Sequence, residues 1–253
     1  MYFRLPTEAA ASGYRYGCVG KRVREFCQDN QGILWIGTED GGLNRFNPKT
    51  KTFSFFTPSS AFTNVHGLCL IGDHLWVGTF SKGVKVVDTR TGAIVKTYQK
   101  TDSPRSLIDN SVFSICRTTT GDIYLGTLFG LLRYNRQSDD FDRIPELNAR
   151  FVYDIKEDSG GNLWLATYAN GAYCYNVNEK RWKNYVHNNT LPNTLANNQV
   201  NCYPNSGRPM KISGEHNSKN CCYYKSVCNY FEDDYKFLHY LNRYRTDGYT
   251  GCS

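Results

Sequence analysis

The chain lacks the segments that mark insertion into or export across a membrane. A transmembrane helix needs about eighteen apolar residues in a row, and none of the apolar runs in this chain approaches that length. The first residues, Met1–Pro6, lack the apolar core of a signal peptide. We therefore expect neither a membrane span nor a signal peptide within this chain.

The side-chain patterns of metal centres and of common enzymes are missing too. The five histidines are dispersed, and the ten cysteines include no CxxC pair, so nothing supports a zinc site. No Ser/His/Asp arrangement can be picked from spacing, no acid–base pair recurs outside the turns, and no kinase motif is present. We expect no cofactor, no metal and no enzymatic activity from the chain itself.

Charge of one sign is not concentrated anywhere. The formal net charge is +7, but the 30 Lys and Arg are interspersed with 23 Asp and Glu. This pattern is typical of a solvated surface rather than of a nucleic-acid-binding stripe, so we expect no nucleic-acid partner. A basic face for acidic polymers is the alternative interpretation.

A short motif, Leu-Trp-Ile-Gly-Thr, is repeated along the chain with small changes. Its four copies begin at Leu34, Leu75, Ile123 and Leu163, at spacings of 41, 48 and 40 residues. Each copy follows a valine-led run, and a glycine and two further strand-like runs come after it. A period near forty built from four short strands predicts β-propeller blades, and no stretch has helical periodicity. The predicted fold is all-β, with about four four-stranded antiparallel blades.

The repeat also explains the most conspicuous side chains. Trp35, Trp76, Tyr124 and Trp164 share one motif position, which favours packing between blades over a functional aromatic cage. Three cysteines lie four residues after an opening valine: Cys27, Cys69 and Cys116. Equivalent strands of neighbouring blades are about 10 Å apart, too far for a disulfide, so we expect small buried apolar side chains.

The regular pattern ends near Asn201. We assign residues 21–199 to four blades, at about 21–57, 62–100, 109–144 and 149–187, after an irregular segment, 1–20. Val200 stands where a fifth unit would begin, but no motif follows it. Residues 200–253 are either a Cys-rich extension or blade remnants damaged by a frame slip or truncation. We favour a damaged sequence, because residues on both sides of the break fit the repeat. We therefore expect the chain to be a fragment of a longer propeller protein.

The run from Gly32 to Pro48 resembles the two-component regulator propeller repeat. Related runs are 65–70, 110–117 and 154–158, and the resemblance covers about residues 21–202. The larger context is similar to the N-terminal sensor region of hybrid two-component systems from polysaccharide-degrading bacteria. The resemblance implies seven-bladed rings in a periplasmic sensor of an inner-membrane receptor. It also implies that released oligosaccharides bind there and that a homodimer signals to a histidine kinase and its phosphorelay. This chain carries no kinase, so contact with a membrane would come only through missing parts.

Loops on one face of the blades are the predicted ligand site. The turn between the second and third strands and the link to the next blade emerge on the same face. Aromatic rings beside carboxylates and amides suit sugars, whose CH faces stack and whose hydroxyls form hydrogen bonds. The candidate ligand-binding residues are Glu39, Asp40, Phe80, Lys82, Arg105, Phe129, Tyr168, Asn170 and His187.

Three functions from different classes remain open. The first is a glycan sensor, which rests on the resemblance. The second is a protein-interaction scaffold that uses the same loops or exposed blade edges. The third is a propeller enzyme, which a glycan panel would reveal by product formation rather than saturable binding.

Overall fold

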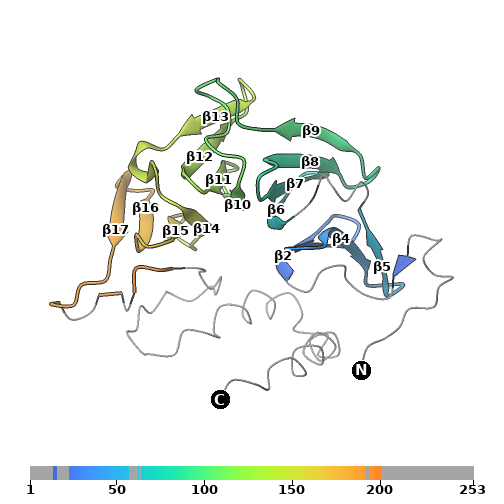
Figure 1. Ribbon diagram of the computed structural model, residues 1–253, viewed down its shortest axis with the longest axis horizontal. Coiled ribbons are helices and arrows are strands. Elements are labelled where there is room, and N and C mark those ends of the chain that lie inside the picture. Colours follow the sequence, from blue (N-terminus) through green and yellow to red (C-terminus); the bar gives the residue numbers. More distant parts are fainter. Residues whose placement is uncertain are drawn as a thin grey trace, which may run out of the picture.

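The described part of the chain forms four antiparallel sheets placed side by side along an arc (Figure 1). The computed structural model describes residues 14–15, 23–56, 62, 64–191, 194–195 and 197–200, with the backbone alone for 14–15. The predictions on the other residues of 1–20 and on residues 201–253 lie outside the described residues. No helix in the described ranges has both the length and the apolar character that a membrane crossing requires.

Strand order follows the chain in three of the sheets, and in the first sheet β1 is added beyond β5. The first sheet has the order β2 (Val23–Gln28), β3 (Leu34–Thr38), β4 (Gly42–Asn47), β5 (Thr52–Phe55) and β1 (Tyr14–Arg15). The second has β6 (Val65–Ile71), β7 (His74–Thr79), β8 (Val84–Asp88) and β9 (Ile94–Tyr98), and the third has β10 (Val112–Arg117), β11 (Ile123–Thr127), β12 (Gly130–Asn135) and β13 (Asp140–Arg143). The fourth has β14 (Val152–Glu157), β15 (Leu163–Thr167), β16 (Ala172–Asn176) and β17 (Arg181–Tyr185). A short 3-10 helix, η3 (Pro145–Leu147), precedes β14.

Each sheet is a propeller blade in its arrangement. The first strands, β2, β6, β10 and β14, lie along the inside of the arc, and β5, β9, β13 and β17 lie along the outside (Figure 1). The predicted all-β fold of four four-stranded antiparallel blades is therefore confirmed. The pairing of β1 with the outer strand β5 was not predicted, because a two-residue strand leaves no repeat signal. Closure into a seven-bladed ring stays a prediction.

The repeated motif supplies the second strand of every blade and a tight turn after it. These strands, β3, β7, β11 and β15, are almost wholly buried. The motif threonine donates from its hydroxyl to the carbonyl across the turn, as Thr79 Oγ1 does to Gly83 O at 2.8 Å and Thr167 Oγ1 to Gly171 O at 2.6 Å. Gly83 and Gly171 have φ of 73° and 75°, which glycine adopts without strain.

Three of the four motif aromatics pack between blades, as predicted. Trp35 packs with Val65 and Leu68 of the second blade, Trp76 with Val112 of the third, and Tyr124 with Val152 of the fourth. Two of the tryptophans are also held by an aspartate of the first turn, because Trp35 Nε1 donates to Asp29 Oδ2 and Trp164 Nε1 to Asp158 Oδ2, each at 2.8 Å. The scaffold interpretation is thus confirmed for Trp35, Trp76 and Tyr124, whereas Trp164 packs against its own blade and the link that follows it.

The cysteines of the first strands carry free thiols. Cys27, Cys69 and Cys116 are not in disulfides, which agrees with the predicted blade spacing, but they are half-buried rather than buried. The difference arises because these side chains lie on the inside of the arc, where a first strand has no further strand beyond it. Desolvation raises the pKa of the Cys69 thiol to about 11, so it stays protonated at neutral pH.

The described chain ends at the position where a fifth blade would begin. In the link between the second and third blades, Lys100 N donates to Asn110 Oδ1 at 2.7 Å, and Gly83 N donates to Asn110 O at 2.8 Å. After the fourth blade, His187 N donates to Asn198 Oδ1 at 2.6 Å and Gly171 N to Asn198 O at 2.8 Å. Val200 therefore occupies the place that Val112 has relative to Asn110, and it packs against Ala166 and Ala172.

Candidate functional site

An extra residue interrupts each inner strand directly after its opening valine. On β6, Val65 pairs with Thr79 and Gly67 pairs with Gly78, so His66 is the extra residue of a β-bulge. The same register shift occurs in the other three inner strands. A bulge re-aims the side chain of its extra residue. The four residues at this position are Arg24, His66, Phe113 and Tyr153.

Aromatic rings from three blades join at this bulge position. The Phe113 ring lies 4.8 Å from His66, 4.4 Å from Phe151 and 5.9 Å from Tyr153 between centroids. Two turn residues extend the group, because the Phe80 ring is 6.2 Å from Phe113 and the Tyr168 ring is 5.9 Å from Phe151. Such offset and tilted contacts are favourable for aromatic pairs.

A charged pair from the first blade completes the site. Arg24 Nη1 donates to the Tyr153 hydroxyl at 3.0 Å, which links the first and fourth blades. Arg24 Nη2 lies 2.8 Å from Glu39 Oε2, and both side chains retain some exposure, 22% and 23%. We call the whole group the inner-edge cluster; it consists of Arg24, Glu39, His66, Phe80, Phe113, Phe151, Tyr153 and Tyr168.

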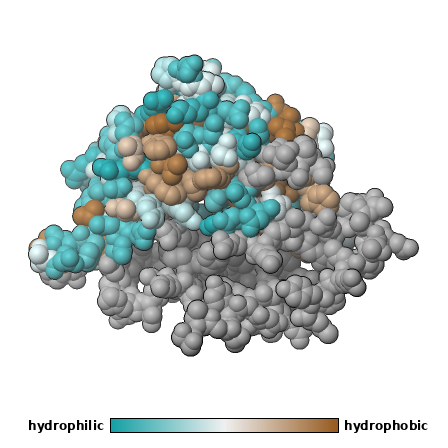
Figure 2. Space-filling model, viewed as in Figure 1, coloured by the Kyte–Doolittle hydropathy of each residue, from teal (hydrophilic) through white to brown (hydrophobic). Residues whose placement is uncertain are grey.

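Backbone hydrogen bonds fix the loops that carry the cluster. Phe80 N donates to Asn64 O at 2.9 Å, and Tyr168 N donates to Phe151 O at 3.0 Å. In these two blades, the turn between the second and third strands is therefore joined to the link that precedes the blade. The exposed aromatic rings of these turns, with Phe80 at 42% and Tyr168 at 50%, stand on a rigid base. Figure 2 shows tan residues with some brown ones across the middle of one face of the arc, and further brown residues toward its right edge, within a mostly teal surface.

The histidine of the cluster is neutral at physiological pH. Desolvation and the nearby Arg24 lower the pKa of His66 to about 4, and Glu39 offsets only part of this. A neutral imidazole offers one donor and one acceptor nitrogen. The cluster thus combines flat apolar rings with the polar groups of Arg24, Glu39, His66 and Tyr153, which suits a ligand with apolar faces and many hydroxyls.

A second polar layer lies next to the cluster on the inner strands. Ser114 Oγ donates to Asp154 Oδ1 at 3.1 Å, and Lys156 Nζ is 3.6 Å from the same oxygen. Desolvation raises the pKa of Glu25 from 4.5 to about 7, against the opposing effect of Lys156. No group of three or more His, Cys, Asp or Glu in the described ranges could hold a metal ion.

The Glu25 pKa makes stability depend on pH. Between about pH 4.5 and 7 the folded chain retains a proton that the unfolded carboxyl has lost, so stability falls as pH rises through this range. We expect Glu25→Gln to raise the free energy of unfolding by about 1–3 kcal/mol at pH 8 and to leave it unchanged at pH 4. Urea unfolding at the two pH values measures this. The exposed Glu179→Gln is the control, and an equal change in both variants would refute the assignment.

The structure places the predicted site residues in two groups. Three of them belong to the inner-edge cluster: Glu39, Phe80 and Tyr168. Asp40 and Lys82 are exposed on the same turns as Glu39 and Phe80, and Asn170 is half-buried beside Tyr168. Phe129 is 50% exposed on the equivalent turn of the third blade, and among the described residues it has no ring contact.

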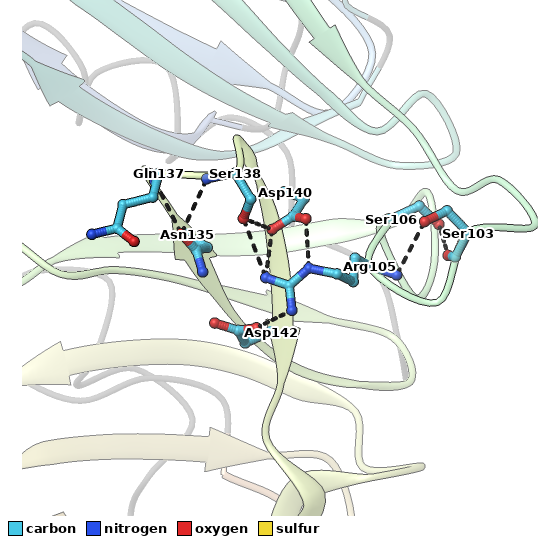
Figure 3. Close-up of polar contacts among 8 residues, drawn as sticks. All are labelled: Ser103, Arg105, Ser106, Asn135, Gln137, Ser138, Asp140 and Asp142. Atoms are coloured by element: carbon cyan, nitrogen blue, oxygen red, sulfur yellow. Dashed lines mark hydrogen bonds and ion pairs between the residues drawn. The ribbon is translucent and has the colours of Figure 1, made fainter.

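The other two predicted residues are engaged within the links. Arg105 donates from Nη2 to Asp140 Oδ1 at 2.7 Å, and its Nη1 lies 2.9 Å from Asp142 Oδ1 (Figure 3). It therefore clamps the link before the third blade onto the outer strand β13. His187 Nδ1 contacts Leu195 O, and its Nε2 lies 2.5 Å from Asn189 Oδ1, both in the link after the fourth blade.

Sequence reasoning missed five members of the cluster: Arg24, His66, Phe113, Phe151 and Tyr153. Four of these directly follow the opening valine of a blade, and Phe151 directly precedes one. Aligning the four units on that valine would have brought them into one column, even though their residue types differ.

Comparison with known proteins agrees with the blade architecture. The family model for the two component regulator propeller matches residues 19–40 and 146–169, which include the motifs of the first and fourth blades. Histidine kinase P4 of Formosa agariphila is 28% identical in an alignment of 158 positions that covers 57% of this chain and 12% of that protein.

Two solved structures share the fold. The extracellular domain of the candidate hybrid two-component system BT3049 from Bacteroides thetaiotaomicron aligns with a TM-score of 0.59 and 23% identity, over 73% of this chain and 26% of that chain. PorZ, a surface component of the type-IX secretion system of Porphyromonas gingivalis, aligns with a TM-score of 0.53 and 16% identity, over 70% and 28%. The chain thus spans a minor part of each relative.

Proposed function

The chain carries repeats of the two-component regulator propeller family, and we propose that it is an oligosaccharide-sensing module of a hybrid two-component receptor. The ligand is a glycan-derived oligosaccharide that binds at the inner-edge cluster. The observation that carries the proposal is that one continuous group of rings and polar side chains receives residues from all four blades.

The chemistry of the cluster supports a sugar as the ligand. Pyranose rings present CH faces that stack on aromatic side chains, and the exposed rings of Phe80 and Tyr168 offer such surfaces. Glu39 accepts hydrogen bonds, Arg24 donates them, and the neutral His66 can do both.

The comparisons support the place of this module in a larger receptor. The structural relative from B. thetaiotaomicron is an extracellular domain, and the curated relative is a histidine kinase. We propose that this module lies in the periplasm, in a homodimeric receptor whose kinase lies outside this chain. A ligand that touches four blades at once favours one arrangement of them, and this shift in population is the signal.

Binding of oligosaccharides to the full chain tests the proposal. We expect saturable binding of at least one member of a panel of plant, algal and host oligosaccharides in isothermal titration calorimetry, without release of products. Phe113→Ala removes the ring at the centre of the cluster and should weaken binding at least tenfold, about 1.4 kcal/mol.

The matched control is Phe129→Ala, on the same face but outside the cluster, which should leave the dissociation constant unchanged. Equal effects of the two variants would refute the site. Sugar cleavage would favour an enzyme, and binding of a protein partner through the cluster, with no sugar bound, would favour an interaction scaffold.

A further inference from the structure

A cleft of about 400 Å³ lies between the second and third blades, away from the inner-edge cluster. Its lining includes Ile71 and His74, at the turn from the first to the second strand, and Arg136, at the turn from the third to the fourth. These turns lie at the opposite end of the blades from the turns that carry Phe80 and Tyr168. The cleft is therefore a separate surface.

The second blade lacks the side chain that covers the motif tryptophan in the first blade. In the first blade Trp35 pairs with Arg45, whose guanidinium carbon lies 4.8 Å from the indole centroid. In the second blade Trp76 pairs with Val86, which is too short to cover an indole in this way. Trp76 and Val86 form the floor of the cleft, where each keeps 5% of its surface exposed.

Aromatic rings form a rigid wall of the cleft. The Tyr98 ring stacks on Trp76 at 5.3 Å, and the Tyr134 ring meets Trp76 edge-on at 4.9 Å. Both tyrosine hydroxyls donate to Asp139 Oδ1 at 2.6 Å, and Lys96 forms an ion pair with the same carboxylate. The rings are thus fixed in advance, and the charge of Lys96 is already balanced.

Arg136 gives the cleft an excess positive charge. Its Nη2 donates to the neutral carbonyl of Gly121 at 2.6 Å, and it forms no ion pair with a described residue. No carboxylate is among the residues that line the cleft. The remaining wall is aliphatic, with Val95 53% exposed at the rim.

We propose that this cleft binds a small aromatic carboxylate. The flat ring of the ligand lies over this floor and against the aliphatic wall, on the side where Arg45 covers the indole in the first blade. Its carboxylate pairs with Arg136, whose planar guanidinium matches a carboxylate in two parallel hydrogen bonds. The volume lies within the range of small-molecule sites, whose walls are mostly apolar with few polar groups.

The test compares 2-naphthoate with its neutral analogue 2-naphthalenemethanol in titrations of the full chain. We expect the carboxylate to bind at least tenfold more tightly than the alcohol and Arg136→Gln to abolish this preference. Val95→Glu places a negative charge at the exposed rim and should weaken naphthoate binding at least tenfold. Val186→Glu, at a valine that is 44% exposed elsewhere, should have no effect.

A filling variant tests the position of the ligand. Val86→Arg copies the Arg45 side chain of the first blade and should abolish naphthoate binding, whereas Phe113→Ala in the inner-edge cluster should leave it unchanged. Equal affinity for carboxylate and alcohol, no binding of naphthoate at 1 mM, or wild-type binding by Val95→Glu would each overturn the proposal. The Val95→Glu result stands even if Val86→Arg does not fold.

Discussion

Replacing Gly78 with valine is expected to lower the free energy of unfolding by more than about 3 kcal/mol. A Cβ at Gly78 would lie 2.9 Å from Val112 O, closer than Cβ atoms approach other atoms in folded proteins, and 3.1 Å from Val112 Cγ1, which is a tight contact. The glycine of the motif is therefore the contact point between one blade and the first strand of the next. Adding a branched side chain forces neighbouring blades apart.

Urea unfolding of the variant and of a control separates this steric effect from backbone strain. Gly72 has φ of 62° and nothing within 4 Å of its Cβ position, so Gly72→Val carries a strain cost of about 1–2 kcal/mol without a clash. If Gly78→Val were as stable as Gly72→Val, the blades would not be packed as the structure shows. Gly37 and Gly126 make the same approach to Val65 and Val152, and we expect the same result there.

Trp35→Ala is expected to cost about 3–5 kcal/mol of stability. The indole is fully buried between the first and second blades, and its Nε1 donates to the buried Asp29. Truncation leaves a cavity between blades and removes one of the hydrogen bonds of a carboxylate that is only 5% exposed. Chemical denaturation, followed by the circular dichroism of the sheets, measures the loss.

The fourth blade provides the comparison for this substitution. Trp164 makes the same hydrogen bond to Asp158 at 2.8 Å, but its side chain is only partly buried. Trp164→Ala should therefore cost less than Trp35→Ala by about 1–2 kcal/mol, the difference in buried apolar area. Equal losses would mean that the hydrogen bond, and not packing between blades, sets the contribution of the motif tryptophan.

The fold could be predicted because its signals are local and repeated. Each copy of the motif combines a buried strand with a threonine and a glycine that shape the next turn, so the same physics appears four times. The pairing of Tyr14–Arg15 with β5 was missed because two residues cannot show a period. The half-exposure of the cysteines was missed because sequence spacing does not indicate which strand faces the inside of the arc.

The site was predicted in part, for a definite physical reason. Turn residues such as Phe80 could be placed on one face, because the direction of each strand follows from the repeat. The bulge residues could not be placed in this way. In a regular strand the side chains alternate between the two faces, and this rule alone would assign His66 and Phe113 to a face. An extra residue in the inner strand changes that assignment and brings side chains of different blades together.

The claim that four blades build one ligand site can be tested most directly by hydrogen–deuterium exchange of the full chain. The exchange of its backbone amides is compared with and without an oligosaccharide that binds. The account predicts slower exchange, on addition of the sugar, at the beginnings of β2, β6, β10 and β14 together and in the turns that carry Phe80 and Tyr168. Protection confined to a single blade, or to the outer strands β5, β9, β13 and β17, would contradict it.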